Sequence, residues 1–458
     1  FTVMKSVIIC DMEGLIKNLN AGAAKMFGYS EKEVVDIKRV SIFSPGEIVL
    51  QNVLSWLRKA NKNGEYTTKT NFIRKDGSIF NAKITITPNF ANGKQNPQTG
   101  YCGITEEIDE DVKVPIYFYT KIIKFLAITR VGFASVSIFP IFVTATYISS
   151  YANFSFNPFS LFLTVLTVVM VHIFTNLYND YFDVNYGTDD NNTGYFNAGL
   201  NSTMLQGAQL SGGSRAVELG LTTIEKTKKF ANKYGFAFVV LAVIVSAISF
   251  YNTQSMINAI SGLAIAGIGA FLGYFYTAKP IKLSYRYGLG ELSCFLCAGP
   301  LLTLASGYAI SNQTILLFSP IFYDLIILGM PLGLLTAGIL FINQFPDYEG
   351  DKKSGKNNLV VVMGKSVSRF VFPLFFVGSF LFLIEILNFN SFNNLVSEFS
   401  NNLIFAGFSS FLIVYSLYII IQTFINYNSR KLIKTNLATI YFNSLFAIIL
   451  IVLINILL

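Results

Sequence analysis

One stretch of the sequence reads Asn176-Leu-Tyr-Asn179-Asp180-Tyr-Phe-Asp183-Val-Asn-Tyr-Gly187-Thr-Asp189 and follows directly on a long apolar run. A second apolar run ends in Asn343-Gln-Phe-Pro-Asp347-Tyr-Glu349-Gly-Asp351-Lys-Lys-Ser-Gly355-Lys356. A carboxylate costs about 2.5–3.5 kcal/mol at the centre of a bilayer, so these groups are expected to face water and bind something. Several convergent hard oxygens suit a divalent cation, and Mg²⁺ usually arrives with substrate phosphates. The two acidic stretches therefore predict a membrane enzyme that uses a diphosphate.

Composition supports a membrane protein. Hydrophobic residues make up 52% of the 458 residues, charged residues only 13%, and the mean hydropathy is +0.51, well outside the range of a soluble domain. The four cysteines predict no disulfide framework. Nine apolar spans, each close to the roughly 20 residues that cross a bilayer, are predicted near 127–148, 159–179, 234–250, 256–276, 291–310, 322–343, 369–388, 403–424 and 437–458. We expect an all-α polytopic bundle of nine transmembrane helices.

The loops between the predicted spans differ in charge, which predicts the side on which each lies. The loops after spans one, three, five and seven contain no Lys or Arg, whereas those after the even-numbered spans are basic. By the positive-inside rule, the basic loops and the amino-terminal region are cytoplasmic. The net charge of +8 then reflects topology, and no nucleic-acid partner is expected. The prediction is an integral protein of the cell membrane with its active-site mouth on the cytoplasmic side.

Helical spacing places the polar residues of each acidic stretch on one face of a helix. The first face comprises His172, Asn176, Asn179, Asp180 and Asp183, and the second comprises Asn343, Asp347 and Asp351. Because both stretches end on the cytoplasmic side, the two faces are predicted to meet across one inward-open cavity. Pro346 is expected to break or kink the sixth span.

The first 112 residues differ from the rest in their short alternating strands and polar turns. Asp76-Gly77 between two such strands predicts a hairpin, and Ser30 with Glu33 fits a capping box at the start of a helix. The order of elements resembles a PAS domain, and the residues that carry this resemblance are Asp11-Met-Glu-Gly14, Asn20-Ala-Gly-Ala-Ala-Lys-Met-Phe-Gly-Tyr-Ser30, Arg74-Lys-Asp-Gly77 and Gly103-Ile-Thr-Glu-Glu-Ile-Asp109. The resemblance implies a small soluble α/β sensory domain over 1–112, with an unknown ligand or protein partner. Residues 113–126 are expected to form a connector with an amphipathic segment leading into the membrane.

The acidic stretches carry a second resemblance. The patterns NDxxD…GxD and NxxxDxxxD…GK resemble the two aspartate-rich motifs of the UbiA superfamily of intramembrane prenyltransferases. Three more segments resemble its 1,4-dihydroxy-2-naphthoate, or menaquinone-pathway, branch: Ser211-Gly-Gly-Ser-Arg215, Tyr276-Thr-Ala-Lys-Pro280 and Tyr287-Gly-Leu-Gly-Glu291. The sequence departs from the common family pattern at Asn343-Gln-Phe-Pro-Asp347 and at Asn357-Asn358, which leaves the acceptor open. The resemblance implies a UbiA-like membrane domain over 127–458.

The second resemblance implies an Mg²⁺-dependent enzyme that transfers a polyprenyl group from an allylic diphosphate. The acceptor is expected to be an aromatic quinone precursor of the 1,4-dihydroxy-2-naphthoate or 4-hydroxybenzoate type, and the lipid bilayer is the surrounding partner. The expected metal ligands are Asn179, Asp180, Asp183, Asp347 and Asp351. The expected catalytic residues are Asp180, Asp183, Asp347, Asp351 and Arg215. Further contacts to the diphosphate and its metal are expected from Asn176, Asn179, Lys279, Asn343 and Lys356.

Several residues and functions keep two interpretations. An allyl cation is stabilised by aromatic faces, and the candidates, which also fit a membrane-interface belt, are Tyr178, Tyr181, Phe182, Tyr274 and Tyr276. His172, the one histidine, either contacts the acceptor or bonds a neighbouring helix, and Glu291 has the same two interpretations. A UbiA-type transferase of archaeal ether lipid, chlorophyll or haem side-chain synthesis is an alternative. A PAS-linked receptor or transporter is a further one, although no paired interruption of the helices, typical of transporters, is expected.

Overall fold

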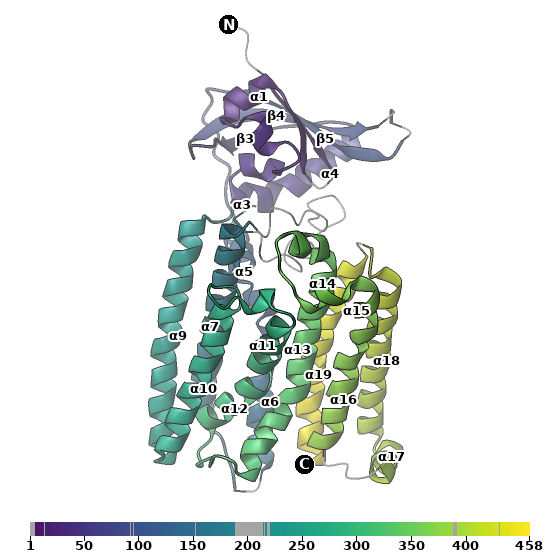
Figure 1. Ribbon diagram of the computed structural model, residues 1–458. Coiled ribbons are helices and arrows are strands. Elements are labelled where there is room, and N and C mark those ends of the chain that lie inside the picture. The colour runs from purple at the N-terminus through teal and green to yellow at the C-terminus, as the bar shows by residue number, and fades with distance from the viewer. Residues whose placement is uncertain are drawn as a thin grey trace. The chain divides into compact units, whose positions relative to one another are not determined.

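The computed structural model describes residues 5–12, 14–91, 93–94, 96–151, 153–187, 214, 216–217, 220–387, 392–429 and 431–458 (Figure 1). The chain divides into two compact units. We call them the amino-terminal unit, Phe1–Thr129 with Thr193–Lys226, and the membrane unit, Arg130–Asn192 with Thr227–Leu458. Arg215 and Asp189 lie outside the described residues.

An antiparallel sheet of five strands forms the centre of the amino-terminal unit, in the order β2-β1-β5-β4-β3. The strands are β1 (Ser6–Asp11), β2 (Ile16–Leu19), β3 (Tyr66–Ile73), β4 (Ile79–Phe90) and β5 (Gln98–Glu107). The predicted hairpin is confirmed, since β3 pairs with β4 in a register that sets Phe72 opposite Phe80. Gly77 in its turn has a φ of 87°, which glycine adopts without steric cost.

Helices between β2 and β3 complete this unit. They are α1 (Ala21–Phe27), α2 (Glu31–Val34), α3 (Gly46–Ile48) and α4 (Leu54–Asn63), and α5 (Phe118–Thr129) follows the sheet. The predicted capping box of Ser30 and Glu33 begins α2. Phe27, Phe43 and Phe72 are among the buried residues of the core, so an apolar interior is enclosed between the sheet and these helices.

Nine helices in the described part of the membrane unit and its boundary are long and apolar enough to cross a membrane, as the sequence predicts. Seven spans contain one main helix: α6 (Ser135–Ser150), α7 (Pro158–Asn185), α9 (Ile224–Thr253), α10 (Met256–Phe275), α13 (Pro320–Lys353), α18 (Leu403–Asn426) and α19 (Leu432–Leu457). Two spans are divided, into α11 (Leu289–Ala298) and α12 (Pro300–Ile310), and into α15 (Lys365–Val371) and α16 (Pro373–Ile386). Short helices α14 (Leu359–Met363) and α17 (Phe392–Asn401) lie between spans.

Prolines have different effects in different spans. Pro346, which the sequence predicts to break or kink the sixth span, does not break it, because α13 continues through it to Lys353. Spans five and seven are each divided, at Gly299, where Pro300 begins a new helix, and at Phe372, which precedes Pro373. Proline lacks the N–H that an interior helical position donates, which accounts for new helices beginning at both positions.

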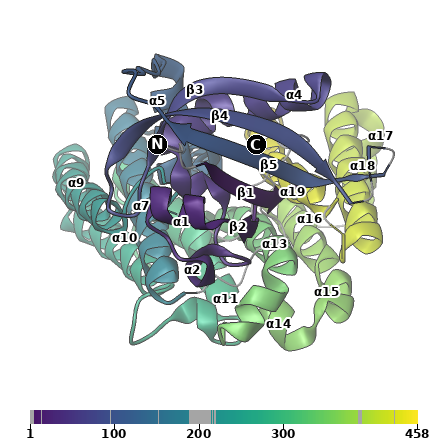
Figure 2. The same cartoon turned by 90° about the horizontal axis from the view of Figure 1, so that it is seen from above.

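Within the bundle, α13 and α19 are central and α9 is peripheral. Much of α13 is buried, and it packs against α11, α12, α16 and α19. Seen from above, α9 and α10 lie at one edge of the bundle and α16 and α18 at the other (Figure 2). Because successive spans cross in opposite directions, α7 and α13 both end on the same side, where the acidic stretches lie.

Candidate functional site

The last turns of α7 supply the first group of polar side chains. Asp180 and Asp183 are buried, with exposed fractions of 6% and 3%. The Asn179 side-chain oxygen accepts a hydrogen bond from the Thr277 hydroxyl, in the loop after α10. Asn176 instead donates to the carbonyl of His172, 2.8 Å away in the same helix, so its amide group serves the helix backbone. The structure thus brings Asn179, Asp180 and Asp183 to the end of α7 that the sequence predicts.

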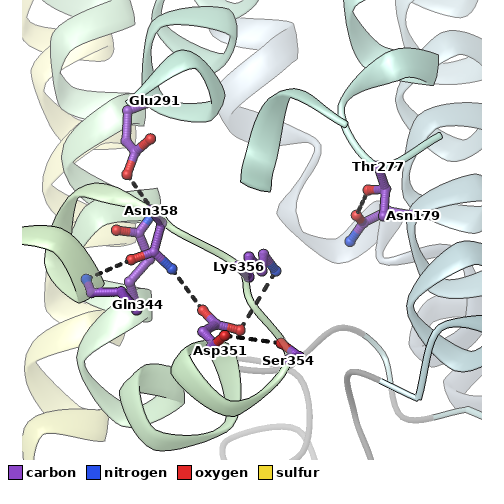
Figure 3. Close-up of polar contacts among 9 residues, drawn as sticks. Asn179, Thr277, Glu291, Gln344, Asp351, Ser354, Lys356 and Asn358 are labelled. Atoms are coloured by element: carbon purple, nitrogen blue, oxygen red, sulfur yellow. Dashed lines mark hydrogen bonds and ion pairs between the residues drawn. The ribbon is translucent and has the colours of Figure 1, made fainter. Parts of the chain in front are cut away.

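The end of α13 supplies the second group. The Asp351 side chain is buried, and its Oδ2 accepts a hydrogen bond of 2.7 Å from Asn358 Nδ2. Lys356 Nζ lies 3.8 Å from the other oxygen, Oδ1 (Figure 3). Asp347 is half-buried one turn earlier. Asn343 Oδ1 accepts a hydrogen bond of 2.9 Å from Asn436 Nδ2 of α19, so this predicted substrate contact is a link between helices.

The two acidic groups meet electrostatically around Lys356. The charges of Asp347 and Asp183 both act on Asp351, although Asp183 comes from a different helix. Burial lowers the pKa of Lys356, but the carboxylates of Asp351 and Asp183 outweigh it and raise that pKa well above the usual lysine value. Figure 3 shows Asn179 with Thr277 on one side and Asp351 with Lys356 and Asn358 on the other. The charges at the ends of α7 and α13 thus interact, as helical spacing predicts, and Lys356 lies beside the Asp351 carboxylate.

A polar network that the sequence does not reveal supports this site. Glu291, at the start of α11, is buried, and its Oε1 accepts hydrogen bonds of 2.8 Å from Gln344 Nε2 and from the backbone N of Leu359. The Tyr287 backbone N donates to the Asn357 carbonyl at 2.8 Å, which joins the loop after α10 to the loop after α13. Gln344 and Asn358 belong to segments in which the sequence departs from the common family pattern. That departure is the feature of the sequence that could have identified them as site residues.

Two lysines lie near Tyr186, just beyond α7. Lys279, a predicted diphosphate contact, is exposed, with Nζ 5.2 Å from the centroid of the Tyr186 ring. Lys282, which sequence reasoning missed, lies closer to that ring, at 3.8 Å, and 4.2 Å from the Tyr285 ring. Burial and the charge of Lys279 lower the pKa of Lys282. These lysines add positive charge to the loop after α10, whereas Arg215 lies outside the described residues.

An apolar cavity of about 340 Å³ opens among the helices of the membrane unit. Its lining includes His172, Cys294, Cys297 and Thr336, with many small residues of α10 and α12. His172 Nδ1 lies 3.1 Å from Ser137 Oγ of α6, so the hydrogen bond to a neighbouring helix is confirmed. Both cysteines are free thiols.

Four of the five aromatic residues predicted to face a cation, Tyr178, Tyr181, Phe182 and Tyr274, form one cluster. Tyr178 packs against Phe182 and Tyr274, with ring centroids 5.6 and 4.9 Å away, and Tyr181 joins the same cluster at 6.1 Å from Tyr178. Among the described residues that line the cavity, none belongs to this cluster. The cluster therefore packs α7 against α10.

The oxygen donors at the site fit an Mg²⁺ ion that is also bound by a substrate better than one held by protein ligands alone. Among the described residues, no three His, Cys, Asp or Glu side chains form a metal-binding group. Mg²⁺ is usually held by one or two carboxylates, and substrate phosphates supply further ligands. Asp183 and Asp351 are buried hard-oxygen donors from two helices, so they fit Mg²⁺ that arrives with a diphosphate.

Comparisons with known proteins give a match for each unit. Residues 224–451 match the UbiA prenyltransferase family, and residues 4–109 match the PAS domain family. Over 119 residues the chain is 35% identical to 2-carboxy-1,4-naphthoquinone phytyltransferase of Synechocystis sp., covering 26% of this chain and 36% of that protein. Over 209 residues it is 27% identical to 1,4-dihydroxy-2-naphthoate octaprenyltransferase of Bacillus subtilis, covering 44% of this chain and 55% of that protein. The chain thus matches less than two thirds of either relative.

Two solved structures are similar to parts of this chain. A UbiA homolog from Archaeoglobus fulgidus bound to DMAPP and Mg²⁺ is similar over 71% of this chain and 99% of its own, at 15% identity and a TM-score of 0.44. A PAS domain from Colwellia psychrerythraea is similar over 23% of this chain and 87% of its own, at 21% identity and a TM-score of 0.22.

Proposed function

A UbiA prenyltransferase domain follows a PAS domain in this chain, and on that premise we propose that it transfers a polyprenyl group from an allylic diphosphate to an aromatic acceptor of the 1,4-dihydroxy-2-naphthoate class. The observation that carries this proposal is the pair of Asp351 and Lys356, 3.8 Å apart at the end of α13, together with the buried Asp183 of α7, whose charge acts on both. Buried carboxylates beside a cation are suited to a metal-bound diphosphate, because the carboxylates hold Mg²⁺ and the cation bonds phosphate oxygens.

We assign the residues of the site as follows. Asp180, Asp183, Asp347 and Asp351 would hold Mg²⁺, with Asn179 as a neutral ligand. When bound there, Mg²⁺ supplies Lewis-acid stabilisation of the departing diphosphate. Lys356, Lys279 and Lys282 donate charge-assisted hydrogen bonds to its oxygens. Asn358 holds the Asp351 carboxylate in one orientation through its hydrogen bond of 2.7 Å.

The apolar cavity would hold the polyprenyl chain of the substrate. A polyprenyl chain buries many methylene and methyl groups, at about 0.8 kcal/mol for each CH₂ removed from water. The small residues of α10 that line the cavity, among them Gly262, Gly269 and Gly273, leave room for such a chain. Its walls also keep water from the allyl cation, so that an aromatic carbon of the acceptor forms the new bond. The ring then loses a proton, or its carboxyl group as CO₂ when the acceptor is a naphthoate.

We also propose that the protein lies in the cell membrane with its site on the cytoplasmic side. The loops at the site end of the bundle carry Lys279, Lys282 and Arg286, whereas residues 151–157, 254–255, 311–319 and 387–402 at the opposite end contain no Lys or Arg. By the positive-inside rule, the site mouth and the PAS domain are cytoplasmic in the cell membrane. The naphthoate class is preferred over 4-hydroxybenzoate because the relatives named above act on naphthoate-type compounds.

The test is transfer by the purified full chain in lipid nanodiscs, supplied with Mg²⁺, a polyprenyl diphosphate and either 1,4-dihydroxy-2-naphthoate or 4-hydroxybenzoate. Asp183→Asn and Asp351→Asn should each lower kcat on the order of a thousandfold, because each removes several kcal/mol of charge stabilisation. Glu349→Gln is the matched control, since Glu349 is exposed on the same helix and should leave the rate unchanged. Near-normal turnover by both Asn variants, or full activity in EDTA, would exclude the proposed site.

A further inference from the structure

One arginine of the membrane unit is held among aromatic rings at the ends of two spans. Arg369 belongs to α15, and its guanidinium carbon lies 5.0 Å from the ring centroid of the neighbouring Phe370. The same carbon lies 5.7 Å from the ring centroid of Phe424, in the last turn of α18, and 4.5 Å from that of Tyr427, which follows α18. All three distances are within the roughly 6 Å over which a ring attracts a cation. Rings from two spans therefore hold this guanidinium in place.

Among the described residues, the positive charge of Arg369 has no acidic partner. No carboxylate in that part of the chain forms an ion pair with the guanidinium, and its Nε is buried without a hydrogen-bond acceptor. Lys365, one helical turn earlier, differs, because the charges of Glu349 and Asp347 act on it. Arginine carries five N–H donors and a permanent charge. Because the Arg369 side chain is only half-buried, an anion from outside the protein can reach it.

The surface beside this arginine is apolar. Four side chains, each more than half exposed, follow one another at intervals of four, three and four residues: Phe370, Leu374, Val377 and Leu381. This spacing places them on one face of α15 and α16, and we call them the apolar stripe. The Phe370 ring also lies 5.0 Å from the Phe424 ring, so the stripe adjoins α18 (Figure 1). Since both spans are long and apolar enough to cross a membrane, lipid chains are the expected neighbours of the stripe.

We propose that Arg369 binds the phosphate of an anionic phospholipid whose acyl chains lie along the apolar stripe. Guanidinium and phosphate form paired, charge-assisted hydrogen bonds, and basic sites between membrane helices are suited to lipid head groups. The rings of Phe424 and Tyr427 hold the guanidinium before the lipid arrives, so less side-chain freedom is lost on binding. A cation beside an apolar stripe favours a lipid over a soluble phosphate, because a soluble phosphate gains nothing from the stripe. This inference goes beyond the proposed transfer reaction and does not depend on it.

The first test measures phospholipid binding to the purified full chain in detergent by native mass spectrometry. Phosphatidylglycerol should bind more tightly than phosphatidylcholine, because no choline group offsets the charge of its phosphate. Arg369→Gln should weaken phosphatidylglycerol binding about 10–100-fold, as expected for loss of a hydrogen bond to a charged group, and remove most of this preference. Lys353→Gln is the matched control, since it removes the same charge at an exposed position of the basic end of α13. An equal loss in both variants, or no loss in Arg369→Gln, would overturn the proposal.

The second test separates a lipid from a soluble phosphate. Glycerol phosphate carries the phosphate without acyl chains, so at millimolar concentration it should not displace phosphatidylglycerol. Displacement at that concentration would assign the site to a soluble anion and reject the lipid.

The third test keeps Arg369 and changes the ring nearest to it, so it applies even if Arg369→Gln does not fold. Tyr427→Leu removes that ring and should weaken phosphatidylglycerol binding about two- to fivefold, the range for an exposed cation–π pair. Tyr427→Phe keeps the ring and should bind as the unchanged chain does. An equal loss in the two variants, or no loss in Tyr427→Leu, would contradict the role given to the ring. None of these measurements depends on transferase activity.

Discussion

At the residue scale, two neighbouring side chains contact the Asp351 carboxylate, one at each oxygen. Asn358 donates to one of its oxygens, and Lys356 lies beside the other. Asn358 also accepts a hydrogen bond of 2.9 Å from the Val361 backbone N, as the N-cap of α14. One side chain thus orients the carboxylate and starts the next helix, so the loop between α13 and α14 is held at both ends.

Replacing Asn358 separates these two tasks. Asn358→Ser keeps a hydroxyl that caps α14 but removes the amide donor to Asp351. A hydrogen bond to a charged group contributes about 1.5–3 kcal/mol, so the apparent affinity for Mg²⁺ with diphosphate should fall about 10–100-fold while the melting temperature changes little. Titration of Mg²⁺ in the transfer assay measures this. Asn357→Ser is the control, and an equal loss in both variants would contradict the role given to Asn358.

Replacing Lys356 tests the cation at the centre of the site. Lys356→Gln leaves Asp351 and Asp183 without their common positive neighbour and removes a charge-assisted donor to the diphosphate, worth about 1.5–3 kcal/mol. Binding of a non-reactive diphosphate analogue, measured by calorimetry in nanodiscs, should weaken about 10–100-fold. Lys353→Gln changes the same charge at an exposed position nearby. If both variants bind the analogue equally well, general attraction by basic loops explains the affinity and Lys356 has no special role.

At the element scale, the fifth span is divided at the point where its backbone packs closely against α13. A Cβ at Gly299 would lie 2.5 Å from the Gly329 carbonyl oxygen, and one at Gly333 would lie 2.4 Å from the Phe295 carbonyl oxygen. The backbones of the two spans therefore touch where α11 ends and α12 begins. In a membrane, helices associate by close packing of small residues because lipid provides no hydrophobic drive. This contact positions Glu291 on α11 against Gln344 on α13.

Adding one methyl group at this crossing should destabilise the bundle. Gly329→Ala places a Cβ 2.5 Å from the Gly299 carbonyl carbon, and such overpacking costs about 1–3 kcal/mol. Gly267→Ala on α10, where nothing lies within 4 Å, should be neutral or slightly stabilising, since alanine favours a helix over glycine by about 0.5–1 kcal/mol. Thermal unfolding in one detergent compares the two variants. Equal melting temperatures would show that the crossing tolerates a wider separation.

At the scale of the whole molecule, two units that fold around different cores are joined by more than one segment of chain. The amino-terminal unit includes α5 and residues 193–226 as well as the PAS domain. The charge pattern of the loops predicts an orientation in the membrane: the four loops after the odd-numbered spans lack Lys and Arg, whereas the loops after the even-numbered spans are basic.

Labelling of single cysteines tests the proposed orientation. In a background with all four native cysteines replaced, Asn153→Cys should react with a membrane-impermeant maleimide in intact cells, because position 153 lies in a loop without Lys or Arg. Ser354→Cys should react only after the cells are opened, since it follows the basic end of α13. Reaction at 354 without reaction at 153 would invert the topology and place the PAS domain outside.

The sequence by itself determined the two parts of the chain, the nine spans and the helix faces that carry the acidic groups. These features follow from local rules: hydropathy over about 20 residues, charge in loops and the 3.6-residue period of a helix. It also predicted the hairpin at Asp76-Gly77 and the capping box, where one turn of chain decides the conformation. The assignments of Asn176, Asn343 and the aromatic cluster did not gain support, because their neighbours come from distant segments or from the helix itself.

Only the tertiary structure decided how these faces combine. Lys356 acquires its place between α7 and α13, and Glu291 its partners on α13 and α14, through contacts between residues separated by more than 50 positions. The Gly220 backbone packs closely against Gly46, which lies about 170 residues earlier in the chain. No local sequence pattern encodes that contact. Such contacts depend on which backbones approach closely enough for a glycine or a buried charge to be required. That approach results from the packing of the whole chain.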